Sequence, residues 1–195
     1  IAAASIGQVY AARLHDGRDI VLKLRRPGIR KQMEADLRIL AHIAELAEQN
    51  LPDVRRYRPR EIVRLLSNAL LEELDFTVEA RNTETLADAF AQDPNIVVPA
   101  IHWPFTSERL LVQDRLSGVP VSDAAALCAS GLDRALIARR GAEAFLKAAF
   151  DEGLFHADPH PGNLFCLAGN RVGFIDFGMI GRLSSTRRSE VVQFI

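Results

Sequence analysis

The stretch Phe155-His156-Ala157-Asp158-Pro159-His160-Pro161-Gly162-Asn163 is followed by an apolar run, a turn and a second apolar run that ends at Asp176. Its prolines and glycine predict a rigid loop, and the runs at residues 164–167 and 172–175 predict two strands. If these strands pair as a hairpin, the residue that enters the first and the residue that leaves the second lie at the same open end. The sequence therefore predicts that Asn163 and Asp176 are neighbours.

Asn163 and Asp176, placed next to each other, could bind a metal ion. An amide oxygen and a carboxylate that converge at a strand end suit Mg²⁺, which takes few protein ligands and fills its shell with water and phosphate oxygens. Asp158, upstream on the same loop, can then face a nucleophile, as in a kinase catalytic loop followed by a metal-binding Asp-Phe-Gly. We predict Asn163 and Asp176 as metal ligands and Asp158 as the catalytic carboxylate. The alternative is an ordinary Asx-turn loop before a buried hairpin.

The composition narrows the classes of function. The chain has 195 residues, with 24 Lys and Arg against 25 Asp and Glu, so no net field favours nucleic acid or an anionic membrane. Cys128 and Cys166 show no metal-type spacing and fit a reducing compartment. No apolar run reaches membrane-spanning length, and no signal sequence precedes the first element. Because the chain begins and ends in mid-pattern, we expect it to be a piece of a longer protein.

Residues 1–10 combine small side chains and one glycine with the start of a strand. Small side chains let the backbone approach a ligand closely, and unpaired amides there can hold phosphate oxygens. The alternative is the tightly packed beginning of an ordinary strand. The candidate nucleotide-binding residues of this turn are Ala3, Ala4, Ser5, Gly7 and Val9.

An Asp-Gly pair at residues 16–17 predicts a hairpin between the strand-like runs 9–14 and 19–24. In the second strand, alternation puts Val21 and Lys23 on one face, which can look under the alanine-rich turn. An ammonium there would reach the α and β phosphates, as the strand lysine of kinases does. The alternative is a half-exposed lysine whose stem packs on apolar surface.

Apolar residues at helical spacing predict three long helices, over residues 29–50, 59–90 and 133–152. Glu73, Asp75 and Glu79 interrupt the otherwise apolar middle of the second helix. One of them can pair with Lys23 and hold the ammonium against the phosphates, and we favour Glu79. Either charge buried alone would cost several kcal/mol, so the pair should form or break as a unit. The alternative for any single glutamate is a solvated surface position.

Residues 95–99 and 110–112 are expected to add two strands to the sheet that carries Lys23. The composition changes abruptly after the second of these runs. We therefore predict two lobes, residues 1–116 and 117–195, joined by a linker whose backbone meets an adenine edge. The candidate adenine-binding residues are Gln113 and Leu116.

Five motifs occur in one order along nearly the whole chain: residues 2–9, residues 21–28, Glu73-Leu74-Asp75-Phe76 with Glu79-Ala80-Arg81-Asn82, residues 156–163, and Asp176-Phe177-Gly178. This order resembles the UbiB/aarF/ADCK family of atypical protein-kinase-like proteins. The alanine-rich loop and the His-x-Asp-x-His-Pro form separate it from ordinary kinases. The resemblance implies an α+β, two-lobed protein-kinase-like fold. It implies that a small antiparallel-sheet lobe with a helical insertion precedes a mainly helical lobe, and we expect this chain to be truncated at both ends of that fold.

The resemblance also implies roles for individual residues, with ATP and Mg²⁺ as cofactors. Lys23 corresponds to the phosphate-anchoring lysine and Glu79 to its helix partner. Asp158, Asn163 and Asp176 correspond to the catalytic and metal-binding residues. The remaining family-motif positions are the Glu-x-Asp pair Glu73 and Asp75 and the histidines His156 and His160.

The family is connected with isoprenoid quinone biosynthesis in bacteria, mitochondria and plastids. The resemblance implies as partners a nucleotide, a quinone-precursor lipid and quinone-biosynthesis proteins, and no nucleic acid. It implies a cytoplasmic location or one at the periphery of the inner membrane, with membrane contact only through family segments missing from this chain. One of these is a Lys-x-Gly-Gln segment expected over the site.

Three functions stay open at this stage. The first is an ATP-dependent atypical kinase or ATPase, and the second is a catalytically silent nucleotide-binding scaffold in a quinone-biosynthesis complex. The third is a small-molecule phosphotransferase of the aminoglycoside-kinase type. The alanine-rich turn and the Glu-x-Asp helix do not belong to that third pattern.

Overall fold

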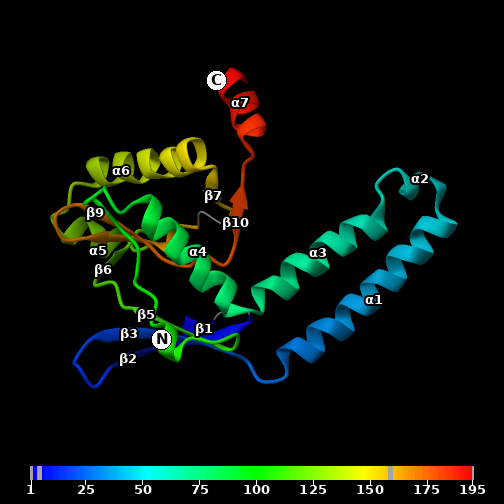
Figure 1. The fold of residues 1–195 in the computed structure, drawn as a ribbon, viewed down its shortest axis with the longest axis horizontal. Helices are drawn as coiled ribbons and strands as arrows, with labels where there is room; N and C mark the ends of the chain where they lie inside the picture. The colour runs from blue at the N-terminus through cyan, green and yellow to red at the C-terminus, as the bar shows by residue number, and fades with distance from the viewer. Residues whose placement is uncertain (1, 4–5, 158–159, 195) are drawn as a thin grey trace.

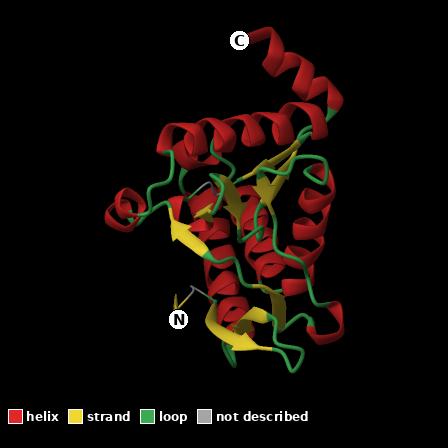
Figure 2. Ribbon diagram, turned by 90° about the vertical axis from the view of Figure 1, so that its left-hand side faces the viewer, coloured by secondary structure: helices red, strands yellow, loops and turns green. Residues whose placement is uncertain are grey.

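The computed structural model describes residues 2–3, 6–157 and 160–194. Figures 1 and 2 show two stacked lobes, with the sheet near the N-terminus at the bottom and helix α6 at the top. The described helices are α1 (Ile29–Asn50), α2 (Pro52–Arg55), α3 (Pro59–Glu73), α4 (Phe76–Ala89), α5 (Ala124–Ala129), α6 (Arg134–Lys147) and α7 (Ser185–Phe194). Short 3₁₀ turns are η1 (Trp103–Phe105) and η3 (Pro161–Asn163), and η2 (Ala148–Glu152) is a π-helical turn.

The first sheet has the strand order β1-β2-β3-β5, and all of its pairings are antiparallel. Its strands are β1 (Ala2–Ala3), β2 (Gly7–Arg13), β3 (Asp19–Arg25) and β5 (Leu110–Asp114). The predicted Asp-Gly turn joins β2 to β3, and Gly17 adopts the positive φ of 90° that such a turn requires. The hairpin prediction for this region is therefore confirmed.

The second sheet has the strand order β4-β9-β8-β6. Its strands are β4 (Ile96–Val97), β9 (Arg171–Phe174), β8 (Leu164–Leu167) and β6 (Gly118–Pro120), and β10 (Ile180–Arg182) pairs separately with β7 (Leu154–His156). Strands β8 and β9 form the predicted hairpin, with Leu164 opposite Phe174. The open end of this hairpin carries Asn163 and Asp176, as the sequence predicted.

One predicted strand belongs to a different sheet. We expected residues 95–99 to extend the sheet of Lys23, but Ile96 and Val97 pair in parallel with Val172 and Gly173 of β9. The strand is only two residues long, so its sequence pattern carries no information about its partner. The predicted boundary between residues 116 and 117 stays a prediction.

The single helix predicted over residues 59–90 is wrong, because the chain bends at Leu74 and Asp75. Asp75 has an extended backbone (φ −105°, ψ 96°), and its side chain caps α4 by accepting a hydrogen bond from the Thr77 amide. The bend is held from outside the helix: the Leu74 carbonyl accepts from the Arg25 guanidinium, and the Phe76 amide donates to the Glu108 carbonyl. Two helices of different direction result.

Helix α4 packs into the first lobe through fully buried side chains. Leu74, Phe76 and Ala80 form a core cluster with Ile6 and Leu111. The Phe76 ring also lies close to Gly7, where an added Cβ would come within 3.5 Å of the ring and 3.0 Å of the Leu24 carbonyl. Packing therefore also favours glycine at this position of the predicted phosphate turn.

Helices α1 and α3 form an antiparallel hairpin that extends away from both lobes in Figure 1. Buried Leu37 and Ala44 line the inner side of α1. Of the helices that the structure describes, none combines the length and hydrophobicity that crossing a bilayer requires. The large apolar side chains that the hairpin exposes include Ile39, Leu40, Ile43, Leu46, Ile62, Leu65 and Leu66.

We predict that Phe76→Ala destabilises the first lobe by about 3–5 kcal/mol, because a 1%-exposed aromatic ring is replaced by a cavity. Chemical denaturation gives the free energy of unfolding. Phe105→Ala, at a 55%-exposed phenylalanine, is the control and should change it by no more than about 0.5 kcal/mol. Equal effects of the two substitutions would contradict the packing described here.

Candidate functional site

A pocket of about 290 Å³ lies where the two lobes meet. It is lined from three directions: by the first sheet, by the region around α3 and α4, and by the loops of the second lobe. A larger groove of about 1110 Å³ between α1 and α3 contains none of the predicted site residues, so the smaller pocket is the candidate site. The residues that line it are Ile6, Lys23, Glu73, Glu79, His156, His160, Asn163, Asp176, Gly178 and Met179.

The Lys23 ammonium is the centre of this pocket's polar contacts. Its Nζ lies 2.8 and 3.0 Å from the two carboxylate oxygens of Glu79 and 3.2 Å from Oδ2 of Asp176. The same ammonium lies 5.5 Å from the centre of the Phe76 ring, within cation–π range. The pairing with Glu79 that the sequence favoured is therefore present, and Asp176 is a second partner.

Strand register explains why Lys23 points into the pocket. Lys23 is paired with Val9 on one neighbouring strand and with Leu111 on the other, in the middle of the sheet. Side chains alternate along a strand, so Val21 and Lys23 share the face that looks toward α4. Glu79 lies one turn into α4, after the Asp75 cap, and the rigid helix start fixes its position.

Burial shapes the protonation of this cluster. The Glu79 side chain is only 5% exposed, and burial raises its pKa to about 7; Asp176 and Glu73 add to the rise, while Lys23 opposes it. For Lys23, burial favours the neutral amine, but Glu79 and Asp176 outweigh that effect and raise its pKa. The pocket therefore holds more carboxylate than one ammonium balances, which favours an additional cation.

Asp176 and Asn163 fit the requirements of a magnesium site. The Ile175 amide donates to the Asn163 carbonyl over 2.9 Å, which ties the two ends of the β8–β9 hairpin together. Asp176 has a positive φ of 65°, rare for a residue with a side chain, and its Oδ1 accepts from the Gly178 amide. One amide oxygen and one carboxylate on a pocket wall, beside an ammonium, form a donor set that Mg²⁺ accepts when phosphate oxygens complete it.

The sequence did not assign a role to Asn82. Its Nδ2 donates to the Phe177 carbonyl over 3.0 Å, so α4 is bound directly to the Asp-Phe-Gly segment. Asn82 lies three residues after Glu79 and thus on the same helical face. This spacing could have identified Asn82 from the sequence as a residue that faces the site. Phe177 is buried, and the centre of its ring lies 5.6 Å from the centre of the His156 ring.

The Glu-x-Asp pair is divided by the helix bend. Glu73, at the end of α3, lines the pocket with Glu79. Asp75 instead caps α4 and lines a different groove, with Arg30 and Glu108. In this structure only the first member of the pair is part of the candidate site.

The two histidines both line the pocket. His160 accepts a hydrogen bond from the Gly162 amide through Nδ1 over 3.0 Å and so holds the turn that leads to Asn163. Asp158, which lies between the histidines in the sequence, falls outside the described residues, as do Ala4 and Ser5. Their roles stay predictions.

The remaining nucleotide-binding candidates lie on or beside the first sheet. Ala3 is in β1, and Gly7 and Val9 are in β2. Gln113 is buried in β5 beside Val21 of β3, on the face that carries Lys23. Leu116 follows β5 and packs against Gly173, where an added Cβ would approach its Cδ1 to 2.7 Å. Gly7, Val9, Gln113 and Leu116 are not among the described residues that line the 290 Å³ pocket, which thus corresponds to the phosphate and metal end of the predicted site.

A protein-family model described as the ABC1 atypical kinase-like domain matches residues 1–195. The chain belongs to this family. The match covers all five motifs, from the alanine-rich turn to the Asp-Phe-Gly segment, and includes the ion pair and the β8–β9 hairpin described above. The predicted family and the α+β kinase-like fold are therefore confirmed.

Relatives support this membership. The chain is 39% identical over 191 residues to a probable protein kinase UbiB of Vibrio cholerae, covering 95% of this chain and 35% of the relative. It is 38% identical over 190 residues to the protein of that name from Xylella fastidiosa, covering 94% of this chain and 34% of the relative. The chain thus spans about a third of the length of these curated relatives.

A solved structure has the same fold. Rv3197 of Mycobacterium tuberculosis, determined in complex with erythromycin, is 31% identical and superimposes with a TM-score of 0.77. The match covers 93% of this chain and 45% of that one.

We predict that Glu79→Gln removes a pH dependence of stability. The pKa of Glu79 rises from 4.5 to about 7 on folding, so the folded state binds the proton more tightly in that window. Its contribution to stability therefore falls as pH rises from about 4.5 to about 7. Denaturant unfolding of both proteins across this range should give a wild-type stability that declines relative to Glu79→Gln.

The matched control is Glu143→Gln, on an exposed position of α6. The difference in the free energy of unfolding between Glu143→Gln and the wild type should not change with pH. A parallel course of the Glu79→Gln and wild-type curves would show that burial does not perturb Glu79.

Proposed function

We propose that this chain is the ATP-binding region of an atypical kinase or ATPase that works with Mg²⁺. The observation that carries the proposal is the contact of Lys23 with both Glu79 and Asp176 in one pocket. Lysine, helix glutamate and Asp-Phe-Gly aspartate are the three charges that kinase-type phosphoryl transfer brings together. Membership of the ABC1 atypical kinase-like family supports the same conclusion.

In this proposal each of the candidate site residues has a defined role. Lys23, held straight by Glu79, binds phosphate oxygens with an ammonium that is already desolvated and oriented. Asn163 and Asp176 are the ligands for Mg²⁺, which supplies charge neutralisation on the phosphates when it is bound. Asp158 orients or deprotonates the attacking group. Lys23 exchanges its contact with Asp176 for phosphate oxygens, while its contact with Glu79 persists.

The wider role that we propose is support of isoprenoid quinone biosynthesis. The motif resemblance and the relatives named UbiB support this assignment. The partners that we propose are a nucleotide, a quinone-precursor lipid and other quinone-biosynthesis proteins, in the cytoplasm or at the periphery of an inner membrane. A lipid profile of a deletion strain, rescued with wild-type and Asp176→Asn genes, identifies the pathway through the intermediate that accumulates.

We predict that Asp176→Asn in the full-length protein weakens Mg-ATP binding at least roughly tenfold, because it removes the metal-binding carboxylate. Binding of ATP in the presence of EDTA should change little. Titration calorimetry measures both affinities, and Asp88→Asn, at an exposed position of α4, is the control. Unchanged Mg-ATP affinity and turnover in Asp176→Asn would exclude this metal site.

Turnover and complementation assays of Asp158→Asn, beside the affinity measurement, separate an enzyme from a scaffold. An enzyme should keep its Mg-ATP affinity and lose about 10²–10⁴-fold in turnover. A scaffold would instead rescue the deletion strain fully with Asp158→Asn and fail with Lys23→Ala.

A further inference from the structure

A short segment before β5 has no role in the site described above. Residues 100–102 run antiparallel to β5, on the edge opposite to β3. The His102 amide donates to the Val112 carbonyl over 2.8 Å, and the Asp114 amide donates to the Ala100 carbonyl over 2.9 Å. Strand β5 is therefore hydrogen-bonded on both edges up to its last residue, Asp114.

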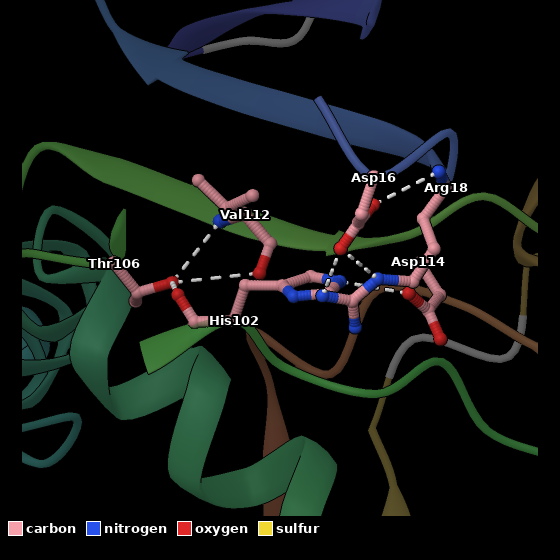
Figure 3. Close-up of polar contacts among 6 residues, drawn as sticks. All are labelled: Asp16, Arg18, His102, Thr106, Val112 and Asp114. Carbon is pink, nitrogen blue, oxygen red and sulfur yellow. Dashed lines mark hydrogen bonds and ion pairs between the residues drawn. The ribbon is translucent and has the colours of Figure 1, made fainter. Parts of the chain in front are cut away.

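The side chain of His102 adds a contact at that last residue. Its ring is 9% exposed, and Nε2 lies 2.7 Å from Oδ1 of Asp114 (Figure 3). The His102 backbone is fixed as well, because the Thr106 hydroxyl donates to its carbonyl over 3.1 Å and accepts from the Val112 amide over 3.2 Å. The His102 side chain is therefore attached to a fixed backbone and contacts Asp114 through its ring, so it can hold the Asp114 carboxylate in place.

Two further charges lie next to this pair, on the β2–β3 turn. Asp16 accepts hydrogen bonds from the Arg18 amide and guanidinium, and Figure 3 shows both beside His102 and Asp114. The pKa of Asp16 is held below its usual value, chiefly by Arg18 and to a small extent by His102. Asp114 in turn contributes to the raised pKa of Arg18. Acidic and basic groups therefore alternate around the end of β5.

The same segment reaches α4. Trp103, next to His102, donates from its indole nitrogen to the Glu84 carboxylate on α4. One stretch of chain thus contacts both the end of β5 and the helix that carries Glu79.

Beyond Asp114 the chain crosses to the second lobe. The Arg115 amide donates to the Asp19 carbonyl over 3.0 Å, and Leu116 packs on Gly173. Gln113, just before Asp114, is buried beside Val21. The direction in which this linker leaves the sheet is set at Asp114.

We propose that His102 is a positioning residue for the nucleobase: through Asp114 it fixes the linker from Gln113 to Leu116 against which the base of ATP binds. This rests on the proposed function and adds to it a residue outside the family motifs. Hydrogen bonds to a base require the linker backbone in its productive place to within a fraction of an ångström. Phosphates, bound at Lys23 and Asp176, do not depend on that placement.

Because only binding of the base depends on the linker position, ligands with and without a base should respond differently to a substitution of His102. Titration calorimetry on the full-length protein compares Mg-ATP with Mg-tripolyphosphate, which has the phosphates and no base. We expect His102→Phe to weaken Mg-ATP binding roughly fivefold to tenfold and to leave Mg-tripolyphosphate within about twofold of the wild type. His102→Gln, whose amide can still donate to Asp114, should recover most of the loss.

The matched control is His42→Phe, the same exchange at an exposed position of α1. It should leave both affinities unchanged. If His102→Phe does not fold, Asp114→Ala removes the same contact from the other side and should give the same pattern. Equal losses for the two ligands, or no loss for either, would overturn the positioning role. Failure of the wild type to bind Mg-ATP at all would instead overturn the proposed function.

Discussion

A single ammonium group, that of Lys23, is held between carboxylates from two distant parts of the chain. Glu79 lies 56 residues away and Asp176 lies 153 residues away in the sequence. Removing the Lys23 ammonium would leave the buried Glu79 carboxylate without compensation, which costs several kcal/mol. The first sheet, helix α4 and the β8–β9 hairpin must therefore all be correctly formed before the pocket has a stable arrangement of charge.

Helix α4 is the element that makes this arrangement possible. Within two turns it presents Phe76 and Glu79 to the ammonium of Lys23, and Asn82 to the backbone of Phe177. Each contact reaches a different part of the structure, so a shift of the helix would change all three together. Because the Asp75 side chain caps the start of α4, it helps to set where these three side chains lie.

Much of this site could be predicted from the sequence, because its parts lie at strong local signals. The Asp-Gly turn fixed the register of Lys23, and the β8–β9 turn brought Asn163 to Asp176. The break before α4 could not be predicted, since apolar spacing continues through it and the contacts that hold it come from Arg25 and Glu108. The partner of His102 likewise depends on a strand pairing with no periodic signature.

A crystal structure of the full-length protein with Mg²⁺ and a non-hydrolysable ATP analogue would show where the phosphates and the cation bind. We expect Lys23 to stay paired with Glu79 and to contact phosphate oxygens, with the cation on Asn163 and Asp176. Phosphates and a cation bound away from the pocket of Lys23, Asn163 and Asp176, or a Lys23 amine pointing out of it, would show that this pocket is not the nucleotide site.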